Sequence, residues 1–302
     1  VDGVGVKAWL HTPSGADDAP DGGVVFADRG NHTVRKVDVA GKVVTLAGSG
    51  VAGYQDDAAP DARFNQPADV AVASSGTIYV ADAGNHRIRR LTTSGLVTTH
   101  AGVGAGFKDG DVAQARFAYP SGLDVGRDSV VFVADTGNHR IRRVDGEGNV
   151  TTIAGAGNQG WLDGDAAKAL FSSPWDVAVD GAGRIWVSDR NNHRIRRLQA
   201  GLVTTVSGNA AGFLDGGANA RFIYPSGLWV HRGGELFVAD DGNHRLRRLR
   251  DGSASCSVDG ACWAQGAANP ADACSRCDVG KSVKAFSAIA DGGACVDGNP
   301  CT

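Results

Sequence analysis

The stretch "VADTGNHRIRRV", from Val133 to Val144, joins an apolar strand pattern to a polar turn and three arginines. Four related strings follow the same pattern: "FADRGNHTVRKV" from Phe26, "VADAGNHRIRRL" from Val80, "VSDRNNHRIRRL" from Val187 and "VADDGNHRLRRL" from Val238. Their histidines, His32, His86, His139, His193 and His244, lie 54, 53, 54 and 51 residues apart. A fixed period near fifty residues is typical of a repeat architecture.

The period that begins at Pro67 reads as four consecutive β-strands. "PADVAVAS", "TIYVADA", "HRIRRLT" and "LVTTHAG" alternate apolar and small residues or are rich in β-branched ones. Ser-Gly and Gly-Asn pairs separate these segments, and such residues tolerate the positive φ of tight turns. A sheet of four strands cannot bury both faces alone, so the copies must stack around an axis.

The sequence therefore predicts an all-β protein, a β-propeller with five identifiable four-stranded blades that closes with five or six. The first copy starts near "DGVGVKAWLH" and contains an apparent insertion, "TPSGADDAPDGG", at residues 12–23. The fifth copy has no clear fourth strand before the first cysteine. We expect the propeller to occupy residues 1–250 and a separate small module to occupy residues 251–302.

Charge and hydropathy exclude some classes of function. The net charge is −3, and residues 1–250 hold equal numbers of basic and acidic side chains. A general nucleic-acid binder needs a basic field, so we expect no nucleic-acid partner. No apolar run approaches the ~18 residues of a membrane span. The 302 residues include no methionine and no signal peptide, so we expect a processed product or an excised piece of a longer protein.

All six cysteines lie in the tail. An even and dense set predicts a disulfide-stapled module and an oxidising compartment, and therefore a secreted or cell-surface protein. Fifteen pairings are possible, and the spacing does not choose among them. Zinc is the alternative, because two of the cysteines form a CxxC. The residues are Cys256, Cys262, Cys274, Cys277, Cys295 and Cys301.

The repeated strings resemble NHL repeats, a family named for an Asn-His-Leu motif. The likeness rests on "VAD-x-GNHRIRR", on "PADVAV" and "PWDVAV", and on the strand ends "LAGSG", "HAGVG" and "IAGAG". Asn-His is present in all five copies, while Thr or Arg replaces the Leu. The resemblance covers residues 1–250 and implies a propeller, usually of six blades. The tail resembles Cys-rich units of bacterial or protist surface proteins that end in "CxDGNxCT".

The recurring polar residues have a structural interpretation in such a ring. The third strand of a blade lies ~10 Å outside the first, so the five histidines are spread out and cannot share a metal ion. We interpret each His and Asn as ordering its own turn. The arginines are expected to pair with Asp82, Asp135, Asp189 and Asp240, which suits the planar guanidinium group. The alternative is a ring of positive charge for RNA, which some animal members of the family use.

One aromatic residue recurs in each long loop: Tyr54, Phe107, Trp161 and Phe213. A repeated aromatic residue fits either a plug between blades or a ligand-binding platform. The inner strands offer Asp69, Asp124 and Asp176, with Trp229 and His231, at positions that do not correspond. They form no recognisable catalytic set. Asn149 and Asn31 begin N-glycosylation patterns.

These observations predict a non-catalytic extracellular scaffold or recognition propeller without a cofactor. It would contact a protein partner or copies of itself within a larger surface or fibre-forming protein. One alternative is a carbohydrate-binding propeller that holds glycans between its loop aromatics. Another is a metal-dependent lyase or lactonase with a site on the ring axis.

Overall fold

The computed structural model describes residues 1–231 and 234–249, and beyond them four short strands. Those strands form two antiparallel hairpins, β23 (Cys256–Val258) with β24 (Ala261–Trp263) and β25 (Ser275–Cys277) with β26 (Phe286–Ala288). The cysteine side chains and the boundary at residue 250 lie outside the described residues. The disulfide, zinc and domain predictions for the tail therefore stay predictions.

The second blade shows the repeat in its complete form. Its strands are β7 (Pro67–Val72), β8 (Ile78–Asp82), β9 (Arg87–Leu91) and β10 (Leu96–Ala101), paired in order as an antiparallel meander. The four predicted strands are confirmed, with ends that differ by at most two residues. A two-residue strand from the preceding loop, β6 (Asp57–Ala58), adds an outer edge.

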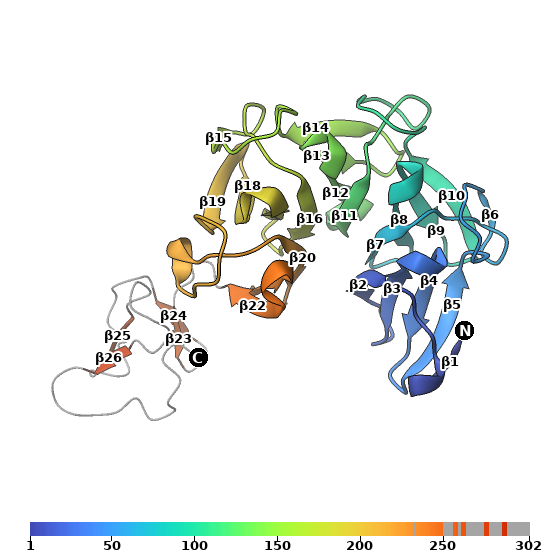
Figure 1. The fold of residues 1–302 in the computed structure, drawn as a ribbon, viewed down its shortest axis with the longest axis horizontal. Coiled ribbons are helices and arrows are strands. Elements are labelled where there is room, and N and C mark those ends of the chain that lie inside the picture. The colour runs from blue at the N-terminus through green and yellow to red at the C-terminus, as the bar shows by residue number, and fades with distance from the viewer. Residues whose placement is uncertain (232–233, 250–255, 259–260, 264–274, 278–285, 289–302) are drawn as a thin grey trace.

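The other described blades repeat this order (Figure 1). The first contains β1 (Gly3–Val4), β2 (Pro13–Asp18), β3 (Val24–Asp28), β4 (Thr33–Val37) and β5 (Lys42–Ala47). The third contains β11 (Pro120–Val125), β12 (Val131–Asp135), β13 (Arg140–Val144) and β14 (Val150–Ala154). The fourth contains β15 (Gly164–Asp165), β16 (Pro174–Val179), β17 (Ile185–Asp189), β18 (Arg194–Gln199) and β19 (Leu202–Ser207). The fifth contains β20 (Pro225–Val230), β21 (Leu236–Asp240) and β22 (Arg245–Leu249).

The helices are all single 3-10 turns in the described residues. Five of them form the polar turn of the repeat: η2 (Arg29–Asn31), η3 (Ala83–Asn85), η5 (Thr136–Asn138), η6 (Arg190–Asn192) and η8 (Asp241–Asn243). The other three are η1 (Gly5–Lys7), η4 (Arg127–Ser129) and η7 (Gly217–Asn219). Within the part of the chain that is described, none of these helices could cross a lipid bilayer.

The prediction of an insertion at residues 12–23 is wrong. Half of this segment is β2, the inner strand of the first blade, which pairs with β3 in the register Ala16↔Phe26. Its composition is polar because no neighbouring sheet covers its outer face, and Ala16 is exposed where the equivalent Val70 is buried. The hydrophobic pattern that marks the other inner strands is therefore absent from the sequence here.

The blades pack side by side through their inner strands. β2 contacts β7, β7 contacts β11, β11 contacts β16, and β16 contacts β20. Each junction holds an apolar core drawn from both blades. A phenylalanine from the connecting loop is buried in each of these cores: Phe64, Phe117, Phe171 and Phe222.

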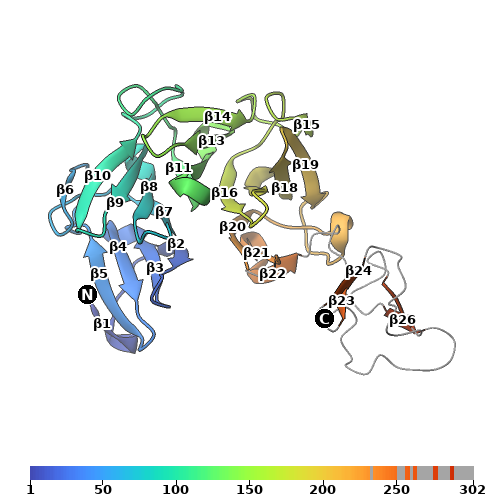
Figure 2. The ribbon, with the colours of Figure 1, turned by 180° about the vertical axis from the view of Figure 1, so that it is seen from behind.

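The five blades form an arc whose ends are the first and the fifth blade, and Figure 2 shows the same arrangement from behind. No further blade among the described residues covers the faces at these ends. Leu246 on β22 is 71% exposed, whereas its equivalents Ile88, Ile141 and Ile195 are fully buried. At the other end Leu10 is 44% exposed, whereas its equivalent Phe64 is fully buried.

Candidate functional site

Each blade contains a buried network of one aspartate, one asparagine and one arginine. In the second blade, Asp82 accepts hydrogen bonds from Asn85 Nδ2 and Arg89 Nη1, both at 2.8 Å. Its other carboxylate oxygen accepts the backbone N–H of Asn65 at 2.8 Å. Asp82 and Arg89 are both fully buried. Both carboxylate oxygens of the aspartate accept hydrogen bonds, and a cation lies beside them, which satisfies the requirement for burying a charge.

The same ion pair recurs in all five blades, which confirms the predicted Arg–Asp ladder. The pairs are Arg35–Asp28, Arg89–Asp82, Arg142–Asp135, Arg196–Asp189 and Arg247–Asp240, with N···O distances of 2.5–2.9 Å. Each arginine also contacts an aspartate in the segment that precedes its blade, as Arg89 contacts Asp56 at 2.6 Å. These guanidinium groups therefore face inward and are unavailable to a nucleic acid.

The repeat histidine joins one blade to the next, which corrects the interpretation that it orders its own turn. Each of the five histidines has a left-handed backbone conformation, with φ of 55–57°. Nδ1 of His86 accepts the backbone N–H of Tyr119, the residue directly before β11 of the next blade, at 2.9 Å. His32, His139 and His193 make the same bond to Gln66, Ser173 and Tyr224. Four separate junctions use four separate histidines.

The lowered pKa values of two repeat histidines support this role, because they keep the imidazole neutral. Burial lowers the pKa of His139 and of His193, and the neighbouring arginines lower it further. A neutral imidazole keeps Nδ1 free to accept a hydrogen bond. The predicted scattering of the histidines is confirmed. Among the residues that the structure describes, no group of three His, Cys, Asp or Glu side chains could hold a metal ion.

The loop aromatics lie against the first arginine of each third strand and outside the apolar cores of the junctions, so the interpretation of these residues as plugs between blades is wrong. The guanidinium carbon of Arg87 lies 4.0 Å from the centroid of the Tyr54 ring, and Arg140, Arg194 and Arg245 lie 3.7, 3.9 and 4.1 Å from Phe107, Trp161 and Phe213. This is cation–π geometry. The four rings remain 46–53% exposed. Their role in binding a ligand stays a prediction.

Four carboxylates line the ring axis. The expectation that Asp69, Asp124 and Asp176 stand at positions that do not correspond is wrong for Asp69 and Asp176, which occupy the same position of their inner strands. Asp69 and Asp176 each stand two residues after the proline that begins an inner strand, whereas Asp17 and Asp124 stand four residues after it. Each accepts a backbone N–H from the next blade, at 2.7–2.9 Å. The shared "P-x-D" of the second and fourth blades was the signal in the sequence.

Glycine and aspartate alternate from blade to blade at the inner-strand position of Asp69 and Asp176. A Cβ atom on Gly15 would lie 1.6 Å from Oδ1 of Asp69, and one on Gly122 would lie 2.2 Å from Oδ1 of Asp176. Any side chain at these glycines would therefore displace the carboxylate of the following blade. The alternation is a steric consequence of five inner strands that converge on one axis.

Burial shifts the titration of the axial carboxylates. It raises the pKa of Asp124 and of Asp176 to about 7. The pKa of Asp69 lies well above its usual range, because of burial first and the nearby Asp176 second. A cavity of ≈ 290 Å³ opens beside this pair and is lined among others by Arg29, Ser121 and Trp175. The carboxylates can hold protons near neutral pH, but their oxygens already accept hydrogen bonds from backbone N–H groups.

The two predicted glycosylation positions differ in access. Asn149 is exposed in the turn before β14. Asn31 is half-buried, and its amide nitrogen donates a hydrogen bond to Asp28 at 2.8 Å. The amide nitrogen of Asn149 also donates a hydrogen bond, to Asp145 at 3.0 Å. Glycosylation of either residue stays a prediction.

Radial sheets around an axis, joined by the histidine and carboxylate bonds, define a β-propeller with five blades in the described residues. The propeller is of the NHL type: the NHL repeat model matches residues 64–91, 117–144 and 171–198. These matches contain the buried Asp–Asn–Arg networks of the second, third and fourth blades, and they confirm the resemblance seen in the sequence.

Comparison with known proteins agrees with this assignment. The chain is 31% identical over 271 residues to Protein SUPPRESSOR OF QUENCHING 1, chloroplastic, of Arabidopsis thaliana, covering 82% of this chain and 26% of that protein. It is 33% identical over 238 residues to NHL repeat-containing protein 2 of Gallus gallus, covering 68% of this chain and 33% of that protein. The chain therefore spans a third or less of these relatives.

A solved streptogramin B lyase has a similar structure. The TM-score is 0.53 at 13% identity, with 84% of this chain and 75% of the lyase covered. At this identity the likeness extends to the fold alone.

Proposed function

We propose that this protein is a non-catalytic recognition propeller that contacts other proteins outside the cell. The recurring polar groups bind other groups of the propeller itself, and this supports the proposed function. The arginines bind Asp residues of their own blades, and the histidines bind the backbone of the following blade. The axial carboxylates also bind backbone N–H groups. The repeats thus build a rigid scaffold whose contacts with partners are made by its surface.

The uncovered faces of the first and fifth blades carry the proposal. Leu246 is 71% exposed and Trp229 is 41% exposed on the fifth blade, at positions that the next blade covers elsewhere in the ring. Leu10 and Ala16 are exposed on the first blade, at positions that the preceding blade covers elsewhere. Exposed apolar clusters of this kind mark interaction sites.

The occupant that fits both faces is a β-sheet of the same blade type. The two faces are the two halves of one interface that the chain forms four times internally. A whole second copy is excluded in this mode, because each blade turns the next one around the axis. The further blades of a second copy would then meet the first blade of the original ring.

Insertion of one repeat tests the proposal. A copy of residues 92–154 placed directly after Leu249 would supply a fourth strand to the fifth blade and one complete further blade. We expect slower hydrogen exchange in β2 and β22 and a higher midpoint of thermal unfolding. The control is the same insert with Val133→Asp and Ile141→Asp in the added copy, which bars its sheet from packing. Unchanged exchange in β2 and β22, or self-association of the unmodified chain that Leu246→Lys abolishes, would reject the proposed occupant.

Carbohydrate binding is a second candidate because each loop aromatic is about half exposed. Aromatic rings at this exposure stack on sugar rings. A glycan array with the wild-type protein and with Trp161→Ala and Phe107→Ala variants tests it. Binding that both variants lose supports this candidate, and an array without binding removes it.

A further inference from the structure

The cavity beside Asp69 and Asp176 lies on the ring axis, where the inner strands begin. Its wall includes, from each blade, the residue that directly follows the first proline of the inner strand. These residues are Ser14, Ala68, Ser121, Trp175 and Ser226. Four of the five are small, so the converging strands leave a space of ≈ 290 Å³ between them.

Two buried carboxyl groups line this cavity. Asp69 is 7% exposed and Asp176 is 8% exposed. Each of their oxygens accepts one backbone N–H, at 2.7–2.9 Å. A carboxylate oxygen can accept two hydrogen bonds, so every one of these oxygens keeps an acceptor position. Neither group forms an ion pair with a side chain that the structure describes, and burial raises the pKa of both.

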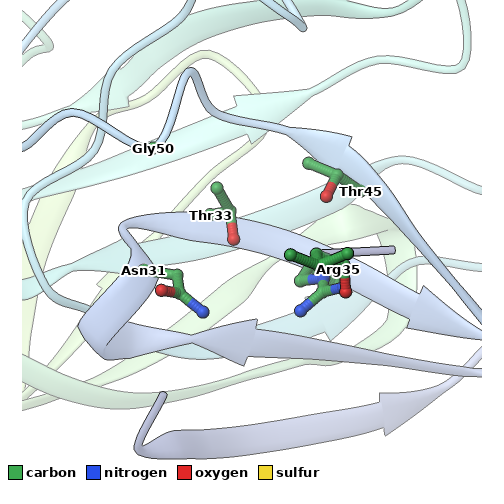
Figure 3. A pocket seen from close by; sticks show the side chains of 6 residues that line it. Asn31, Thr33, Arg35, Thr45 and Gly50 are labelled. Atoms are coloured by element: carbon green, nitrogen blue, oxygen red, sulfur yellow. The ribbon is translucent and has the colours of Figure 1, made fainter. Parts of the chain in front are cut away.

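The cavity wall contains one arginine, Arg29 of η2. It donates a hydrogen bond to the hydroxyl group of Tyr119 and, within the described part of the chain, to no carboxylate. Arg35, which lies beside the ≈ 200 Å³ cavity of the first blade (Figure 3), differs because it binds Asp28 at 2.8 Å and Asp2 at 2.9 Å. Arg29 therefore keeps N–H donors and an uncompensated charge for a ligand.

Trp175 gives the cavity one large apolar wall. The guanidinium carbon of Arg190 lies 4.7 Å from the centroid of its ring, which is cation–π geometry. Arg190 also binds Asp241 at 3.1 Å, so its charge is already paired. The stacked arginine fixes the ring, and the part of the ring that lines the cavity offers a surface on which an apolar group can pack.

We propose that this cavity binds a zwitterionic α-amino acid with an apolar side chain. Its carboxylate pairs with Arg29, since guanidinium and carboxylate groups form two parallel hydrogen bonds. Its ammonium group donates to the remaining acceptor positions of Asp69 and Asp176. Its side chain packs against Trp175. The volume of ≈ 290 Å³ lies at the small end of ligand sites, which measure ~300–1,000 Å³.

The charges of the cavity select this class of ligand over simpler ions. An anion would compensate Arg29 and leave the two carboxyl groups without a cation. A cation would compensate the carboxyl groups and meet the like charge of Arg29. The inference does not depend on the proposed protein contacts of the end faces, because Arg29, Asp69 and Trp175 belong to the axial cavity.

Calorimetric titration of the full chain with L-phenylalanine tests the proposal. Three further ligands each lack one group: 3-phenylpropionate lacks the ammonium, 2-phenylethylamine lacks the carboxylate, and L-alanine lacks the ring. We expect each to bind at least about tenfold more weakly, because each loses charge-assisted hydrogen bonds or buried apolar area. Absence of L-phenylalanine binding would overturn the proposal, and so would equal affinity for any of the three other ligands.

Variants locate the ligand on the axis. Arg29→Gln and Asp176→Asn should each weaken L-phenylalanine binding about tenfold. Arg127→Gln controls for the first change, because Arg127 is exposed at the opposite end of the inner strands. Asp124→Asn controls for the second, because the oxygens of Asp124 also accept two backbone N–H groups but do not line the cavity. Both controls should keep the wild-type affinity, and losses equal to those of the site variants would overturn the assignment.

Binding should also release protons at pH 7. The pKa of Asp176 is about 7 and that of Asp69 lies well above its usual range, and the neighbouring Asp17 and Asp124 act on this pair. An ammonium group beside the pair favours the ionised carboxylates. Titrations in two buffers of different ionisation enthalpy should show release for L-phenylalanine and none for 3-phenylpropionate. The same proton balance for both ligands would contradict the position of the ammonium group.

Discussion

In each blade one aspartate and one arginine lose nearly all contact with solvent. Burial of such a pair is unfavourable unless the remaining donors and acceptors are satisfied. Here the third partner is the repeat asparagine, and backbone groups supply the rest. The network therefore fixes the course of the loop over the third strand, because the arginine also binds loop carbonyls such as that of Lys108.

Loss of one buried arginine should strongly destabilise the fold. Arg142→Leu leaves Asp135 charged, buried and without its cation, so we expect the free energy of unfolding to fall by about 3–5 kcal/mol. Arg143→Leu on the same strand is the control, because that side chain is only half-buried, and a change below about 1 kcal/mol is expected. Urea unfolding measures both variants. Equal losses would show that the ion pair does not determine the stability.

The axial carboxylates make stability depend on pH. The pKa of Asp176 is about 7 in the folded chain against an ordinary value of 3.8, so folding favours its protonated form. This stabilisation is complete below pH 3.8 and is lost as the pH rises through 7. We expect Asp176→Asn to flatten the fall in unfolding free energy between pH 4 and 8.

Asp145, a half-buried residue in the turn before β14, provides the control for this pH dependence. Hydrogen bonds from Asn149 lower its pKa, so Asp145→Asn should leave the profile between pH 4 and 8 unchanged. Unfolding curves at each pH give the comparison. A profile for Asp176→Asn that is parallel to that of the wild type would contradict the assignment of the proton to the axis.

At the scale of elements, the 3-10 turn between the second and third strands connects neighbouring blades. It ends in a histidine with positive φ, which aims the imidazole away from its own sheet. The backbone N–H that it reaches also belongs to a residue with positive φ, directly before the proline that starts the next blade. Two unusual backbone conformations are thus held against each other at every internal junction.

The contribution of this junction can be isolated with a matched pair of variants. His139→Ala and His244→Ala introduce the same strain at positive φ. Only His139 binds the next blade, whereas the side chain of His244 has no hydrogen-bond partner among the described residues. We expect His139→Ala to lower the unfolding free energy by about 1 kcal/mol more than His244→Ala. Chemical denaturation measures this difference, and a difference of zero would reject the role of the bond.

At the scale of the whole molecule, each blade is buried by the blades beside it around the axis. The same position on the third strand is fully buried in four blades and 71% exposed in the fifth. The stability of stacked repeats is approximately the sum of the blades and their interfaces. Within the described residues the end blades have one blade–blade interface each and the central blades have two, so the end blades should open first.

A pair of apolar truncations tests this gradient. Ile195→Ala removes buried methyl groups from the junction of the fourth and fifth blades and should lower the unfolding free energy by about 2–5 kcal/mol. Leu246→Ala removes exposed groups at the equivalent position, and a change near zero is expected. Thermal unfolding of both variants measures these changes in stability. A large loss for Leu246→Ala would mean that another part of the molecule covers this face.

The sequence alone determined the period, the four strands of the second blade and the partners of the arginines. These features depend on residues close in the chain, such as Asp82 and Arg89, or on a pattern that five copies repeat. The first inner strand was misread as an insertion because its uncovered face carries no hydrophobic pattern.

Only the tertiary structure decided where the histidines point, what the loop aromatics cover, how the axial carboxylates alternate with glycine and which faces remain exposed. Each of these contacts joins residues that are 30–55 positions apart. Side-chain direction and burial at such contacts arise when one sheet meets the next, so the local pattern of polar and apolar residues does not contain them.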